Sequence, residues 1–80
     1  MHAKVYITFK NGVLDPQGKA IHHALLALGF SGINDVRQGK LIELDLAETD
    51  PDKAHRTVDE MCSKLLANTV IETYQIELTA

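Results

Sequence analysis

Two Asp-Pro pairs, each followed by an apolar helical pattern, most constrain the fold of this 80-residue chain. An aspartate carboxylate can cap the free N–H groups at a helix start. A proline fits the first helical position because its φ is preset and no useful N–H is lost. Asp15-Pro16 and Asp50-Pro51 therefore predict helices that begin at Pro16 and Pro51. Each pair comes after a segment that alternates between polar and apolar residues, as a strand with one buried face does.

The first strand is predicted where residues 4–10 alternate, and Asn11-Gly12 ends it because both residues tolerate positive φ. The first helix carries an apolar stripe at helical spacing, which is expected to lie on the sheet. Gly29 is expected to end this helix in a left-handed conformation. The stripe consists of Ala20, Ile21, Ala24, Leu25 and Leu28.

Two residues of the first helix do not serve the helix itself. Gly18 stands in the first turn, where it costs about 1 kcal/mol relative to alanine. Such a glycine indicates that a strand, a ligand or a second subunit approaches the backbone closely. Leu26 lies opposite the apolar stripe, among polar residues. A scattered surface leucine is the default interpretation, but in a chain with a thin core we interpret Leu26 as a contact with another chain.

Residues 33–47 read as strand, interrupted by the segment 37–40. The interruption predicts a tight hairpin turn, a glycine bulge in one long bent strand, or a continuous strand. Val36 keeps the same parity as Ile42 across the gap, so the sequence leaves these alternatives open.

The second helix is predicted from Pro51 to about Asn68, a plausible terminator, and the last strand over Val70–Leu78. The apolar stripe of this second helix consists of Ala54, Val58, Met61, Cys62, Leu65 and Leu66.

The element order β-α-β(β)-α-β predicts one α+β domain over residues 1–80. Two helices are expected on one face of a small antiparallel sheet, and a central hairpin would make the arrangement ferredoxin-like. The other sheet face is polar and of mixed charge.

Composition narrows the function classes. A net charge of −3 argues against a nucleic-acid partner, which needs a basic face. The longest apolar run, Ala24–Leu28, is too short to span a membrane. A single cysteine forms no internal disulfide and fits a cytoplasmic location. Eighty residues bury only a thin core, for which association with other chains is a common remedy.

The chain predicts no catalytic, cofactor-binding or metal-binding residues of its own. His22 and His23 are adjacent and lack the i, i+4 spacing of helical metal ligands, and the glycines form no nucleotide-binding pattern. Cys62 falls on an apolar stripe, where a buried inert thiol is expected. Asp50 and neighbouring acids suit a helix cap better than a cation site. Arg37 and Lys40 could bind an anion or a partner's carboxylate, although a solvated turn explains them too.

A resemblance to a known family covers essentially the whole chain. The run Gly12–Ile21, with the sequence GVLDPQGKAI, closely resembles the PurS family, the small subunits of phosphoribosylformylglycinamidine (FGAM) synthase. The similarity continues through Ala24–Phe30, Val36–Lys40, Ile42–Leu44 and Met61–Glu72. Thr69 departs from the family pattern, which usually has proline there.

The resemblance implies a PurS-like fold and a role in a three-chain complex of purine biosynthesis. A glutaminase subunit would release ammonia, and a large synthetase subunit would use ATP and Mg²⁺ to form the amidine. This chain would not be catalytic alone and would contain no cofactor. It would form a dimer or higher oligomer that joins the other two subunits and supports ammonia transfer. The positions expected to face partners or to shape the loops that do are Asp15, Gln17, Gly18, Lys19, Arg37, Gly39 and Lys40.

Two other classes remain open. A regulatory module of the ACT type has a similar element order and would bind an amino acid or a nucleotide. A stand-alone enzyme would need a paired acid and base, which the sequence does not offer. The sequence does not choose between dimer and tetramer, nor does it say which surface meets which partner.

Overall fold

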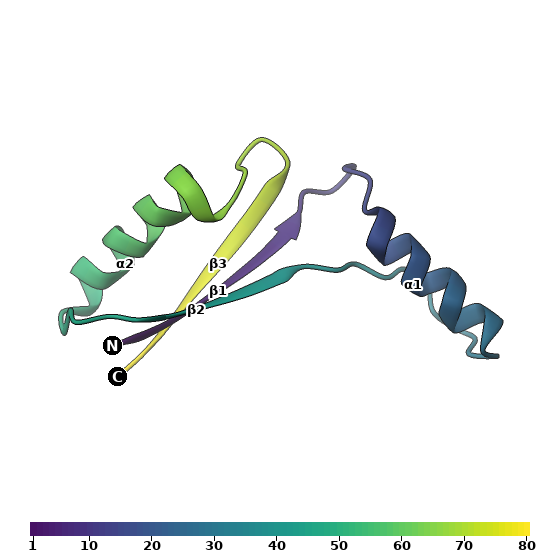
Figure 1. The fold of residues 1–80 in the computed structure, drawn as a ribbon, viewed down its shortest axis with the longest axis horizontal. Helices are drawn as coiled ribbons and strands as arrows, with labels where there is room; N and C mark the ends of the chain where they lie inside the picture. Colours follow the sequence, from purple (N-terminus) through teal and green to yellow (C-terminus); the bar gives the residue numbers. More distant parts are fainter.

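The computed structural model describes residues 1–80 as a three-stranded sheet with two α-helices (Figure 1). The elements in chain order are β1 (His2–Phe9), α1 (Pro16–Ala27), β2 (Lys40–Asp45), α2 (Pro51–Met61), the π-helical turn η1 (Cys62–Leu66) and β3 (Glu72–Thr79). The strand order is β2-β1-β3, and both pairs are antiparallel. The predicted α+β class and the predicted order of strands and helices are confirmed.

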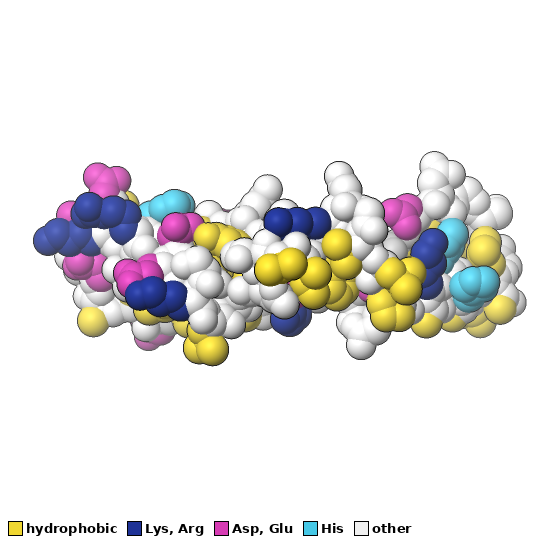
Figure 2. All heavy atoms as spheres, turned by 90° about the horizontal axis from the view of Figure 1, so that it is seen from above, with side chains coloured by type: hydrophobic (Ala, Val, Ile, Leu, Met, Phe, Trp, Pro, Cys, Tyr) yellow, Lys and Arg dark blue, Asp and Glu magenta, His cyan; other side chains and the backbone are white.

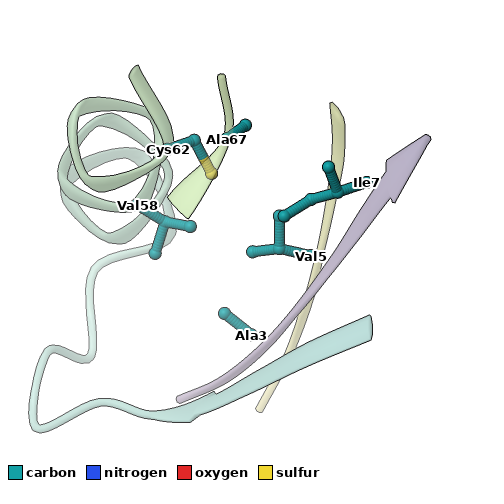
Figure 3. Packing of buried hydrophobic residues seen from close by; sticks show 6 residues of the cluster. All are labelled: Ala3, Val5, Ile7, Val58, Cys62 and Ala67. Carbon is teal, nitrogen blue, oxygen red and sulfur yellow. The ribbon is translucent and has the colours of Figure 1, made fainter. Parts of the chain in front are cut away.

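The core lies between one face of the sheet and α2. Val5 in the central strand pairs with Ile42 of β2 and Ile76 of β3. Val58 and Cys62 point from the helical side toward the apolar side chains of β1 (Figure 3). The fully buried cluster is small, and it comprises Ala3, Val5, Ile7, Val58, Cys62 and Ala67.

The second helix begins as the Asp50-Pro51 pair predicts, because the Asp50 carboxylate accepts a hydrogen bond from the Asp52 N–H at 3.0 Å. Its apolar stripe is confirmed for Ala54, Val58 and Cys62, which are fully buried. Leu65 is a correction, because its side chain is 83% exposed. The wider π turn after Met61 places more residues in each turn than an α-helix, so a stripe extrapolated at α-helical spacing rotates off the core.

The expectation that both helices lie on the sheet is right for α2 and wrong for α1. The first helix projects beyond the end of the sheet and makes no extensive contact with any strand (Figure 1). The molecule therefore measures 48 × 26 × 15 Å, with a radius of gyration of 15.9 Å. A compact chain of this length has a radius of gyration of about 12 Å.

The apolar stripe of α1 consequently has no sheet beneath it. Ile21 is 40% exposed and Leu28 is 74% exposed, whereas Leu25 is half-buried. Amphipathic spacing predicts that a helix has a buried face, but it does not say which surface covers that face. For α1 no strand of this chain provides that surface.

The middle segment forms a single strand, β2, without a hairpin. Residues 30–39 lead back from α1 to the sheet outside any helix or strand, and Gly32 has a φ of +80°. The strand predicted over 33–47 is therefore shorter than expected. Gly39 marks where the returning chain meets β1, since a Cβ there would lie 2.4 Å from the carbonyl oxygen of Ile7.

No helix combines the length and the apolar character needed to cross a membrane.

Replacing Val58 by alanine should lower the free energy of unfolding by about 2 kcal/mol, because two buried methyl groups are lost and a cavity remains. Val70 is 79% exposed, so Val70→Ala is a matched control that should change stability by less than about 0.5 kcal/mol. Urea unfolding followed by circular dichroism measures both variants. Equal effects of the two substitutions would contradict the position of the core.

Candidate functional site

Two segments of the chain meet where α1 leaves the sheet (Figure 1). The outgoing segment, Phe9–Gly18, leads from β1 into the first turn of α1. The returning segment, Val36–Gly39, leads back toward β2. We call the place where they meet the arm root, because α1 projects from it. Five of the seven residues predicted to face or shape a partner interface belong to these two segments, and the other two, Lys19 and Lys40, directly follow them.

Asp15 joins the two segments through both oxygens of its carboxylate. Oδ1 accepts the N–H of Gly18 at 2.9 Å, which is the predicted helix cap. Oδ2 accepts the N–H of Gln38 at 2.8 Å, and this bond spans 23 residues of sequence. The hydrogen bonds from Gly18 and then Gln38 lower the pKa of Asp15 from its ordinary 3.8. The charge of Arg37 lowers it further, against an opposing effect of burial.

Gly18 is buried against the returning segment. A Cβ at this position would lie 2.4 Å from the carbonyl oxygen of Val36 and 2.6 Å from the Asp15 carboxylate. No side chain fits that distance without a shift of the backbone. The close neighbour that the sequence indicates is therefore this chain's own residue Val36.

Arg37 ties the returning segment to the end of β1. Its guanidinium donates hydrogen bonds to the side-chain oxygen of Asn11, at 2.7 Å, and to the carbonyl oxygen of Phe9. An arginine can serve two acceptors at once because its donors form a planar fork. In this chain the fork is occupied by its own backbone and side-chain acceptors.

The remaining predicted interface residues line two shallow hollows beside the arm root. A hollow of about 160 Å³ includes Gln17, Gly39 and Lys40 in its wall, and one of about 220 Å³ includes Lys19 and Arg37. Gln17, Lys19 and Lys40 are exposed, so they are available to another molecule. Asp15 and Gly18 are buried, so they act on the shape of this surface.

Leu26, the predicted contact with another chain, lies on the exposed part of α1 and is 50% exposed. It lies in the second half of α1, beyond the arm root, and is not among the residues that line the two hollows. Figure 2 shows that apolar side chains are widespread over the middle of the molecule and its α1 end, whereas charges concentrate at the α2 end.

The side chains considered for chemistry have structural surroundings. The imidazole Nε2 of His22 lies 2.9 Å from the carbonyl oxygen of Ile33, which links α1 to the loop before the returning segment. Cys62 is fully buried as predicted. Burial raises the pKa of its thiol, and the charge of Asp59 adds to this effect. No group of three or more histidine, cysteine, aspartate or glutamate side chains is close enough together to hold a metal ion.

Three residues at or near the arm root were missed by sequence reasoning. Gln38 contributes a backbone N–H, and Asn11 contributes a side-chain oxygen to Arg37. Glu72 is almost fully buried, accepts the N–H of Asn68 at 2.7 Å and lies 3.4 Å from the Lys40 ammonium. The sequence does not indicate where a backbone N–H donates, because nearly every residue has one. Nothing in the sequence distinguishes Glu72 from an ordinary residue at the start of a strand.

These features define a small α+β protein whose first helix and arm root face outward, as in a subunit of a larger assembly. Comparison with known proteins agrees. The model of the family described as "PurS: Phosphoribosylformylglycinamidine (FGAM) synthase" matches residues 2–80. The FGAM synthase subunit PurS of Bacillus subtilis is 51% identical over 75 residues, covering 94% of this chain and 88% of that protein. The PurS subunit of Synechocystis is 48% identical over 79 residues, covering 99% and 79% of the two chains.

Solved structures are also similar. The crystal structure of PurS from Methanocaldococcus jannaschii superposes with a TM-score of 0.85 at 43% identity, covering 95% of this chain and 92% of that one. A chain in a structure described as PurLQS from Thermotoga maritima gives a TM-score of 0.82 at 29% identity, covering 96% of both chains. The chain belongs to the PurS family of FGAM synthase subunits, and the family resemblance noted in the sequence is confirmed.

The lowered pKa of Asp15 predicts a stability that depends on acid pH. A carboxylate whose pKa is lower in the folded state stabilises the fold fully above its ordinary pKa of 3.8, and this contribution disappears as the pH falls through the folded-state value. Asp15→Asn should therefore destabilise the protein near neutral pH and have a smaller effect at about pH 3. Urea unfolding of both proteins at the two pH values measures the difference. An effect of the same size at both would contradict the role of the charge.

Proposed function

We propose that this chain is the non-catalytic accessory subunit that joins the glutaminase and synthetase subunits of a cytoplasmic FGAM synthase. In this reaction glutamine supplies nitrogen, and the synthetase subunit uses ATP and Mg²⁺ to form the amidine. The observation that carries the proposal is the similarity over 96% of both chains to a member of the PurLQS structure. The arm root supports it, because exposed polar residues there surround a preformed backbone.

Supporting ammonia transfer is a physical requirement of such a complex. Free ammonia is largely protonated near neutral pH, and the resulting ammonium ion has no lone pair with which to attack. Two active sites that share ammonia must therefore be held together so that it does not equilibrate with water. A small protein with an outward-facing helix can hold them without contributing a reacting group.

Reconstitution tests this role. The chain is mixed with the glutaminase and synthetase subunits, ATP, Mg²⁺ and the ribonucleotide, and amidine formation is followed with either glutamine or ammonium salt. Glutamine-dependent activity should require the chain, whereas ammonia-dependent activity should not. Equal glutamine-dependent activity without the chain would overturn the proposal and favour a ligand-binding module.

Self-association is the second part of the proposal. The apolar stripe of α1 has no cover within the chain, while α2 leaves part of the core-side sheet face uncovered along β2. Ile42 and Leu44 of that strand are only half-buried. One copy thus supplies an apolar helix, and a second copy supplies an apolar sheet surface. In a dimer with a two-fold axis this helix-to-sheet contact is made twice. Burying an exposed isoleucine or leucine contributes about 1.5–3 kcal/mol each.

The helix face that mediates this contact can be tested by charge substitution. Ile21→Glu should reduce the oligomer mass measured by sedimentation, because an unpaired carboxylate is costly in an apolar contact. His23→Glu, on the other side of the same helix, is the matched control and should leave the mass unchanged. Dissociation by Leu26→Glu instead of Ile21→Glu would place the contact on the opposite face. A monomeric parent protein would overturn self-association altogether.

A further inference from the structure

The two Asp-Pro helix starts of this chain look alike in sequence but differ in their hydrogen bonds. Asp50 accepts one hydrogen bond, from the Asp52 N–H two residues away. Asp15 accepts its local bond from Gly18 and a second bond from Gln38, across the arm root. The second bond is not needed to cap a helix, because Oδ1 already does so.

We propose that Asp15 is a positioning residue that locks the direction in which α1 leaves the sheet. The lock rests on the proposed function in one respect only, namely that another subunit binds α1 in the direction that the lock sets. Its parts are the Asp15 bond to Gln38, the Arg37 fork on Asn11 and Phe9, and the close packing of Gly18 on Val36.

The three parts act on the same two segments from different sides. The carboxylate holds the backbone of the returning segment at Gln38. One residue earlier, the Arg37 side chain reaches back to the end of β1. One residue earlier again, the Val36 carbonyl lies against the backbone of α1 at Gly18. Successive residues therefore hold the strand end and the helix start, so α1 cannot rotate about its first turn without breaking several contacts.

The lock compensates for the absence of packing under α1. A helix that lies on a sheet is aimed by its buried side chains, whereas the stripe of α1 is largely exposed. Without the lock, α1 would sample many directions, and a binding partner would have to select the competent one. Selecting one direction out of many lowers the apparent affinity of the partner, and a preset direction removes this loss.

Asparagine separates the lock from the helix cap. Its side-chain oxygen caps a helix about as well as aspartate does. Its other terminal atom is an amide nitrogen that donates, so it cannot accept the Gln38 N–H. Asp15→Asn therefore keeps the cap and loses the lock, and Asp50→Asn is the matched control, since Asp50 has no second bond to lose. Gly18→Ala disturbs the same contact by steric overlap without a change of charge.

The direction of α1 can be measured with spin labels at engineered cysteines, His23→Cys on α1 and Arg56→Cys on α2. Cys62 is fully buried and remains in place. Labelled chains are diluted with excess unlabelled chains, so that only distances within one chain are recorded by pulsed electron resonance. Far-UV circular dichroism shows that each variant retains its helices.

The parent protein and Asp50→Asn should give one narrow distance distribution. Asp15→Asn should broaden it, with about a tenfold rise in the population outside the parent peak, the change expected for one lost hydrogen bond to a charged group. Gly18→Ala should broaden it too, because the added Cβ would overlap the Val36 carbonyl oxygen. An unchanged distribution in Asp15→Asn, or equal broadening in Asp50→Asn, would overturn the lock. If Asp15→Asn fails to fold, Gly18→Ala decides by the same criterion.

The result is independent of the proposed function. The distances are measured without partner subunits, so failure of reconstitution or of self-association leaves them interpretable. Conversely, the lock could be intact in a protein that does not support glutamine-dependent activity. That result would support the positioning role of Asp15 and overturn the proposed function.

Discussion

The Asp15 carboxylate holds two parts of the chain together that no apolar core connects. On one side is a sheet covered by α2, and on the other is α1 with its stripe exposed (Figure 1). Two backbone N–H groups, at Gly18 and Gln38, meet on this one side chain. The elongated form of the molecule depends on that contact together with the Arg37 fork.

The core explains why α1 is free to project. The fully buried cluster consists of small and medium side chains on β1, α2 and the residues that follow α2 (Figure 3). One amphipathic helix is enough to cover the β1 and β3 side of the sheet. Apolar surface along β2 and on α1 remains exposed or half-buried, and the proposed self-association would bury it, as is common for chains this short.

Two glycines show how backbone contact replaces side-chain packing at the arm root. At Gly18 and at Gly39 a Cβ would lie 2.4 Å from a carbonyl oxygen of another segment. In both places the neighbouring segment belongs to the same chain and lies far away in sequence. The family motif GVLDPQGKA thus contains residues that shape the backbone, Asp15 and Gly18, beside exposed residues such as Gln17 and Lys19.

Local chemistry alone determined where both helices begin and which face of β1 is buried. Asp-Pro pairs begin both helices, Gly12 and Gly29 adopt positive φ as predicted, and the alternation of residues 4–10 gives the buried face of β1. These features depend on residues that are close in sequence, so the sequence contains the whole cause. The specific family motif likewise identified the PurS family without a structure.

Only the tertiary structure decided where α1 goes, that the middle segment forms a single strand, and that Leu65 leaves the core. Each of these depends on a neighbour distant in sequence or on a turn wider than the α-helical period. The most consequential donor of the arm root, the Gln38 N–H, belongs to the backbone and would be present with almost any residue at that position. An amphipathic pattern predicts that a helix has an apolar face, and only the three-dimensional structure shows that the sheet of this chain covers that face for α2 and leaves it largely exposed for α1.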